Sequence, residues 1–341
     1  MRKLFRSAIL GLVPLAVALL GGVARAETPE LNFGIISTES SQNLRARWQP
    51  FLDDMSKETG FKIHAFFASD YAGIVTGMQY NKVQVALYGN KSAIEAVDRA
   101  GGEVFAQTTD MAGAGGYYSH LIARKDSSLN NEKDVLAQAK NLTFSNGDPN
   151  STSGFVVPGY YVFAMNQADP KVIFKRTLNA NLETNALSVA NKQVDVATSN
   201  NISLEHLAKQ QPEKRAQIKV IWTSPLIPSS PLVWRKDLPA EIKEKISRFV
   251  MGYGIPGRAE AAHEKAVLES MQMGPFRASN DDQLLTIRQL ELFRDRGMIE
   301  SNANIDAADR QARITDIDGK LAALDARIKK LGQAQKFGVA Q

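Results

Sequence analysis

The chain has 341 residues, no cysteine and a formal net charge of +5. The lack of cysteine excludes disulfides, thiolate metal sites and a lipid anchor on cysteine. The length exceeds what one hydrophobic core commonly supports, so we expect two lobes.

The first 26 residues are predicted to be an export signal and not part of the fold. A basic start precedes an apolar run from Ala8 to Val23, and small residues at Ala24 and Ala26 form a cleavage pattern. We predict cleavage after Ala26 and a periplasmic location. The segment holds four basic and no acidic residues, so its removal lowers the net charge from +5 to +1. A nearly neutral protein lacks the basic surface that nucleic acids require, so no nucleic-acid partner is expected.

Strand-like and helix-like segments alternate along the chain. LNFGIIS (31–37) predicts a strand, and FKIHAFF (61–67) predicts a second one. Between them, SQNLRARWQPFLDDMSKETG (41–60) predicts an amphipathic helix that ends at Gly60. This order favours an α/β fold with largely parallel sheets.

Two stretches of the chain are similar to each other. GIVTGMQYNKVQVALYGN (73–90) and ETNALSVANKQVDVATSN (183–200) each predict a helix, an Asn-Lys turn and a strand. The strands would cover residues 83–86 and 194–197. The match is short, so chance similarity is an alternative to two lobes that share one βαβ plan.

Two segments are candidates for crossings between the lobes. LIARKD (121–126) follows a Gly-rich turn, and SPLIPSSPLVW (224–234) is rich in Pro and Ser, which favours an extended path. Two crossings make the first lobe discontinuous. The predicted units are 27–122 with 224–300 as lobe 1, 123–223 as lobe 2, and 301–341 as a C-terminal helical tail.

The tail carries an apolar stripe at coiled-coil spacing. Its members are Ile314, Ile317, Leu321, Leu324, Ile328 and Leu331. The stripe fits a helix that packs on its own lobe, and it also fits a helix that forms a homodimer.

The segment GDPNSTSG (147–154) places three hydroxyl residues in front of a predicted helix. One hydroxyl suffices to cap a helix, because its oxygen accepts a bond from a free backbone N–H group. Three in succession, followed by Gly154, also offer O–H and N–H donors at the positive end of a helix dipole. The segment therefore predicts either a cap or a binding site for an oxyanion.

Beyond these patterns, the chain closely resembles the periplasmic phosphonate-binding proteins that serve ABC importers. The similar stretches span the predicted mature chain and include LNFGIISTES (31–40), DYAGI (70–74), EAVDRAGGEVFAQT (95–108), GDPNSTSGFVVPGYYVFA (147–164), SPLIP (224–228) and PFRAS (275–279). The resemblance implies an α/β, two-lobed type II binding-protein fold, with two mixed sheets flanked by helices, a two-segment hinge and a C-terminal helix. It implies a membrane permease as partner and no metal or organic cofactor.

The resemblance also implies which residues hold the ligand. The phosphorus oxyanion would be bound by Ser151, Thr152 and Ser153 of the hydroxyl loop, and by Tyr71 and Tyr117. The alternative for both tyrosines is half-buried packing.

Three positions depart from the family members that take 2-aminoethylphosphonate. Their acidic residues align with Ile202 and Ser230, and their histidine aligns with Leu182, so the partners of the ammonium group are missing here. A buried ammonium without a carboxylate is strongly disfavoured. We therefore expect phosphite, hypophosphite or a short alkylphosphonate as ligand. 2-Aminoethylphosphonate or a broad phosphonate range is the alternative, if Glu183 or Glu205 reaches the pocket.

Two other classes of function are less consistent with the sequence. Ser151 has no G-x-S-x-G elbow around it, and the four histidines are scattered without metal-ligand spacing, which argues against an enzyme. A periplasmic sensor of phosphorus anions fits the same residues as an importer component. Phosphorus uptake after deletion of the protein distinguishes these two roles.

Overall fold

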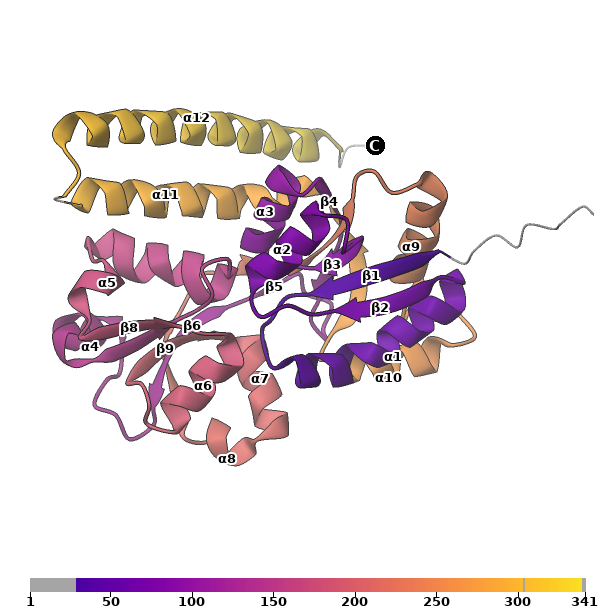
Figure 1. Ribbon diagram of the computed structural model, residues 1–341, viewed down its shortest axis with the longest axis horizontal. Coiled ribbons are helices and arrows are strands. Elements are labelled where there is room, and N and C mark those ends of the chain that lie inside the picture. Colours follow the sequence, from indigo (N-terminus) through magenta and orange to yellow (C-terminus); the bar gives the residue numbers. More distant parts are fainter. Residues whose placement is uncertain (1–28, 303, 339–341) are drawn as a thin grey trace, which may run out of the picture.

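The computed structural model describes residues 29–302 and 304–338, and the predicted signal peptide lies outside them. Two β-sheets lie side by side, and helices flank each of them (Figure 1). Both sheets mix parallel and antiparallel strands, so the expected two-lobed α/β architecture is confirmed. No helix in the described part of the chain is long and apolar enough to cross a membrane.

The first sheet has six strands in the order β13-β4-β12-β3-β1-β2. They are β1 (Glu30–Ile35), β2 (Lys62–Phe66), β3 (Val85–Leu87), β4 (Gly102–Thr109), β12 (Pro231–Arg235) and β13 (Gly274–Ala278). One face is covered by α1 (Ser41–Thr59), α9 (Ala240–Gly252) and α10 (Ala261–Ser270). The other face is covered by α2 (Tyr71–Gln79) and α3 (Asn90–Arg99).

Helix α1 shows how local sequence sets an element of this lobe. Ser40 caps it by accepting the Asn43 N–H at 3.2 Å. Gly60 ends it in the left-handed region, with φ of 72°, and donates its N–H to the Ser56 carbonyl. Glycine adopts this conformation without the steric cost that a Cβ brings. The predicted end of the helix at Gly60 is thus confirmed.

The second sheet has five strands in the order β10-β6-β9-β7-β8. They are β6 (Ser119–Arg124), β7 (Thr143–Asn146), β8 (Arg176–Asn179), β9 (Val196–Asn200) and β10 (Ile218–Thr223). The helices of this lobe are α4 (Glu132–Gln138), α5 (Pro170–Ile173), α6 (Leu182–Ala190), α7 (Asn201–Gln210) and α8 (Pro212–Arg215).

The internal similarity corresponds to one unit in each lobe. Helix α2 leads into β3, and α6 leads into β9. Each turn contains a residue with positive φ, Asn81 at 54° and Lys192 at 62°. The resulting strands β3 and β9 lie inside their sheets, each parallel to one neighbour. The shared turn conformation supports a common βαβ plan over chance similarity.

The first crossing lies earlier in the chain than we predicted. Residues 121–124 belong to β6, which pairs with β9 and β10, so residues 119–122 are part of the second lobe. The run SHLIAR is buried because β6 lies between these two strands. The chain crosses instead at β5 (Gly116–Tyr117), which pairs with β11 (Ile227–Pro228) of the return segment.

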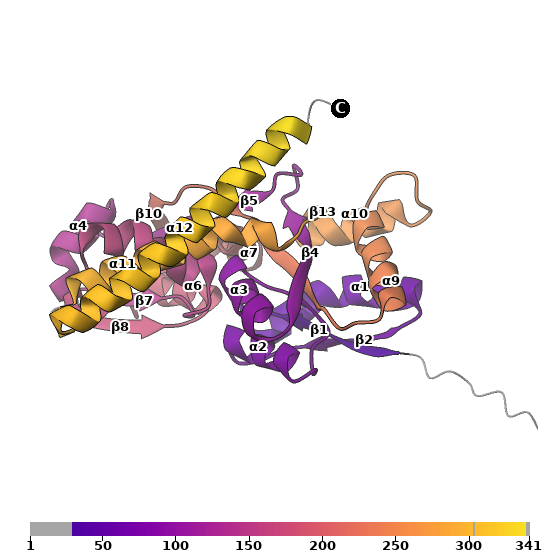
Figure 2. The same ribbon diagram turned by 90° about the horizontal axis from the view of Figure 1, so that it is seen from above.

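The C-terminal part forms a helical hairpin of α11 (Leu285–Ser301) and α12 (Ala307–Gly338), which extends across the two lobes (Figure 2). Within the predicted stripe, Ile317 and Leu321 are buried, and α12 packs along α11. The stripe therefore packs within its own chain, as one of the two alternatives expected. A homodimer through α12 would need another surface, or would have to displace α11.

Helix α11 contacts both lobes. Arg288 forms two hydrogen bonds of 2.6 Å with Asp98 of the first lobe. Arg294 lies over the Phe155 ring of the second lobe, 5.3 Å from its centroid. The hairpin thus bridges the lobes in addition to the two crossing segments.

Candidate functional site

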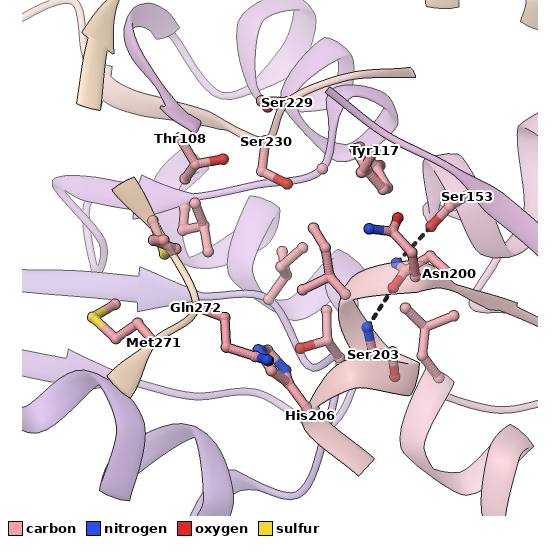
Figure 3. A pocket seen from close by; sticks show the side chains of 18 of the residues that line it. Thr108, Tyr117, Ser153, Asn200, Ser203, His206, Ser229, Ser230, Met271 and Gln272 are labelled. Carbon is pink, nitrogen blue, oxygen red and sulfur yellow. Dashed lines mark hydrogen bonds between the residues drawn. The ribbon is translucent and has the colours of Figure 1, made fainter. Parts of the chain in front are cut away.

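A cavity of about 380 Å³ lies between the lobes, lined by residues from both of them. The residues expected to bind the oxyanion or to set the ligand specificity all line it, which are Tyr71, Tyr117, Ser151, Thr152, Ser153, Leu182, Ile202 and Ser230. Figure 3 shows Tyr117 and Ser153 at one end of this cavity, and Gln272 and His206 at the other. The structure therefore brings the predicted residues together in one place.

The hydroxyl loop is held closed by its two glycines. The Gly147 N–H donates to the Gly154 carbonyl at 2.9 Å. A Cβ added at Gly147 would lie 2.6 Å from the Gly154 Cα, and one at Gly154 would lie 2.8 Å from the Ser151 hydroxyl. Neither position has room for a side chain, so both glycines are required for the close approach that forms the loop.

Each hydroxyl oxygen of the loop accepts one hydrogen bond from an N–H group. Ser151 accepts from the Gly154 N–H at 2.9 Å and caps the π-helical turn Thr152–Val156. Thr152 accepts from the Lys91 N–H at 2.9 Å, across the cleft, and Ser153 accepts from the Asn200 amide at 3.0 Å. A hydroxyl that accepts a bond keeps its proton to donate. The segment is therefore a cap and a set of three oriented donors at once.

Two tyrosine hydroxyls converge on this loop. Tyr71 begins α2, and Tyr117 lies on the crossing strand β5; both are at least 95% buried. Burial and the Asp148 charge raise the pKa of Tyr71, against the opposing effect of a hydrogen bond with Ser151. Burial raises the pKa of Tyr117 to about 12, although hydrogen bonds with Ser153 and Thr152 counteract it. Both phenols therefore keep their protons at neutral pH and can donate them.

The three positions that depart from the family members that take 2-aminoethylphosphonate, and that we expect to set the ligand specificity, differ in burial and polarity. Leu182 is buried at the start of α6, and Ile202 is half-buried in the first turn of α7. Ser230 comes from the return segment just before β12, and its carbonyl accepts the Thr108 N–H. Leu182 and Ile202 thus give the cavity apolar lining, and the Leu182 side chain lies next to Gly154 of the hydroxyl loop.

No sequence pattern indicated the charged cluster that joins the lobes at the cavity. Arg47 of α1 forms an ion pair with Glu39, and its second nitrogen donates to that carboxylate at 2.9 Å. His206 of α7 lies 3.0 Å from the same carboxylate through Nδ1. Glu39 and Arg47 are only 8 positions apart, but His206 is far from both in the chain, so only the fold shows that the three meet.

Of the two acidic residues that could restore an ammonium site, one lines the cavity. Glu205 is an exposed lining residue, 3.4 Å from the Asn201 amide. Glu183 is engaged elsewhere. Its carboxylate accepts the Ser40 N–H at 2.7 Å and the Asn43 amide at 2.6 Å, so it links the second lobe to the start of α1.

Known proteins are similar to this chain in sequence and fold. Residues 33–284 match the family model described as ABC transporter, phosphonate, periplasmic substrate-binding protein. The chain belongs to this family. A relative from Escherichia coli (strain K12), named phosphonates-binding periplasmic protein, is 57% identical over 304 residues, which are 89% of this chain and 88% of the relative.

Solved structures of relatives have the same fold. A binding-protein component of an ABC phosphonate transporter from Pseudomonas aeruginosa is 56% identical, with a TM-score of 0.86 over 90% of this chain and 100% of that one. PhnD1 from Prochlorococcus marinus, solved with methylphosphonate, is 20% identical, with a TM-score of 0.68 over 76% of this chain and 96% of that one. The type II binding-protein fold implied by the sequence is therefore confirmed. The family consists of transport components, and within the described residues no group of three or more His, Asp or Glu side chains is arranged to hold a metal ion.

Proposed function

We propose that this phosphonate-binding protein captures a small phosphorus oxyanion between its lobes and delivers it to the permease of an ABC importer. The observation that carries the proposal is the hydroxyl loop. Ser151, Thr152 and Ser153 each accept one N–H bond and thereby present an oriented O–H donor to the cavity. Tyr71 and Tyr117 add phenol donors at the same end. Such hydrogen bonds to an anion contribute about 1.5–3 kcal/mol each.

We propose phosphite, hypophosphite, methylphosphonate or ethylphosphonate as the ligand. Leu182 and Ile202 are apolar lining residues, against which burial of a methyl or ethyl substituent is favourable because its apolar surface leaves water. Glu39, another acidic residue of the cavity, is already paired with Arg47. The cavity of about 380 Å³ leaves room for a substituent or for water beside the oxyanion.

One observation favours 2-aminoethylphosphonate as the second candidate. Glu205 lines the cavity and is free of any ion pair within the described part of the chain. An aminoethyl arm that extends from the hydroxyl loop toward the cleft mouth would place its ammonium near this carboxylate. The relative that is 57% identical is named for phosphonates in general, which is consistent with either candidate.

Ligand capture follows from the contacts between the lobes. The Thr152 hydroxyl meets the Lys91 N–H, and Glu183 meets Ser40 and Asn43, only when the lobes approach each other. An oxyanion that bonds to Tyr71 of one lobe and Ser151 of the other adds to these contacts. The ligand therefore shifts the population toward the closed form, which the permease would recognise.

The test is a calorimetric titration of the purified protein with the six anions phosphite, hypophosphite, methylphosphonate, ethylphosphonate, 2-aminoethylphosphonate and phosphate. We expect the small anions to bind tightly and 2-aminoethylphosphonate weakly. The reverse order, abolished by Glu205→Gln, would establish the second candidate instead.

A double variant tests the anion socket, which consists of the hydroxyl loop with Tyr71 and Tyr117. Ser151→Ala with Thr152→Ala removes two donors, so we expect binding to be abolished while circular dichroism shows a folded protein. Ser127→Ala with Ser128→Ala, in the turn after β6, is the matched control and should bind like the wild type. Normal affinity of the socket variant would remove the hydroxyl loop from the site.

A further inference from the structure

The anion socket is built without a free cationic side chain. Among the described residues that line the cavity, Arg47 is the only Lys or Arg, and it is paired with Glu39. Lys91 turns its backbone N–H to Thr152, but its ammonium lies against Glu95 at 2.6 Å and against Glu291. The socket therefore attracts an anion through neutral donors and helix dipoles alone.

A carboxylate is part of the same loop. Asp148 accepts the Asn150 N–H at 2.7 Å with Oδ1 and the Tyr71 N–H at 3.2 Å with Oδ2. It thus occupies the first N–H of α2, which would otherwise be available to an anion. Burial raises the pKa of Asp148, the Asp70 charge adds to this effect, and the two backbone hydrogen bonds oppose it.

The carboxylates near the socket make its electrostatic environment negative, because the nearby cations are already paired. The charges of Asp148 and Glu39 both act on Tyr71, and the Asp70 charge acts on Asp148 from the first lobe. The Arg47 charge is balanced by Glu39, which His206 also contacts. The Lys91 ammonium is paired with Glu95 and Glu291, so it is not free to meet the ligand. Among the described residues that line the cavity, no unpaired Lys or Arg is therefore left to compensate a second negative charge on the ligand.

We propose that Asp148 makes this socket selective for the singly charged form of the oxyanion. The inference rests on the proposed function, since it concerns the charge of the ligand in that site. Phosphonates and phosphite lose their second proton near neutral pH, as phosphate esters do at about pH 6. In their singly charged form, phosphonates and phosphite keep one P–OH group. Hypophosphite has no second acidic proton and stays singly charged. Binding above the second pKa of the ligand then requires the uptake of one proton.

The test is calorimetry with methylphosphonate at pH 8, in two buffers of different ionisation enthalpy. If methylphosphonate does not bind, phosphite or 2-aminoethylphosphonate replaces it, since both have a second ionisation. We expect an uptake of about one proton, and an affinity that falls about tenfold per pH unit above the second pKa of the ligand. Hypophosphite, which is singly charged throughout, should show neither effect. Binding without proton uptake would overturn this inference alone, whereas no binding of any phosphorus anion would refute the proposed function.

Two matched variants assign the effect to Asp148. Asp169 also precedes a proline and accepts the N–H two residues further on, that of Lys171 at 2.8 Å, but it caps α5 away from the cavity. We expect Asp148→Asn to lower the proton uptake toward zero, so that its affinity no longer falls with pH and at pH 8 exceeds that of the wild type about tenfold. Asp169→Asn should behave like the wild type. Undiminished proton uptake in Asp148→Asn, with hypophosphite still bound, would show that another group sets the selectivity.

Discussion

Replacing Tyr117 by phenylalanine removes one donor from the socket and leaves the ring in place. Tyr117 is 5% exposed, and its hydroxyl contacts Thr152 and Ser153. A hydrogen bond to a charged group contributes about 1.5–3 kcal/mol, and about 1.4 kcal/mol is a factor of ten in affinity. We therefore expect the variant to bind its oxyanion about 10- to 150-fold more weakly, with a change of less than about 1 kcal/mol in the free energy of unfolding.

The assay is calorimetric titration with the tightest ligand, combined with urea unfolding in the absence of ligand. Tyr88→Phe is the matched control, because Tyr88 is fully buried and donates its hydroxyl to the Ile74 carbonyl at 3.1 Å, away from the cavity. It should lose about 1 kcal/mol of stability and keep its affinity. Equal affinity of Tyr117→Phe and the wild type would refute the role of this phenol in the socket.

Two further predictions concern the contacts between the lobes. Glu183→Gln replaces a carboxylate that accepts hydrogen bonds from Ser40 and Asn43, so the closed form loses charge-assisted bonds. Ligand release in stopped-flow measurements should therefore be about 3- to 30-fold faster than in the wild type. Glu132→Gln, in the first turn of α4, is the control, and equal release rates of Glu183→Gln and the wild type would contradict the prediction. For Glu39, burial raises the pKa, but hydrogen bonds with His206 and Arg47 outweigh it, so the folded pKa lies below the ordinary value of 4.5. This carboxylate therefore stabilises the fold above pH 4.5, and the contribution is lost as the pH falls through the folded pKa. Between pH 7 and pH 4, the free energy of unfolding measured with urea should fall less for Glu39→Gln than for the wild type. Equal decreases would contradict the prediction.

The sequence determined those features that depend on a few neighbouring residues. The end of α1 at Gly60 follows from the conformational freedom of one glycine. The two glycines and three hydroxyls of residues 147–154 contain the chemistry of the loop, because the loop closes on itself. The family resemblance added Tyr71 and Tyr117, which no local pattern connects to the loop.

Only the tertiary structure decided how distant segments meet. The stripe on α12 was compatible with two partners, and the fold selects α11 because the hairpin returns along it. The first crossing was placed too late, since burial of β6 between β9 and β10 depends on strands far along the chain. The contact of Glu39 and Arg47 with His206, and that of Asp148 with Tyr71, join residues of different lobes. Spacing in one chain does not encode such pairs, because their geometry arises only when the two lobes close on each other.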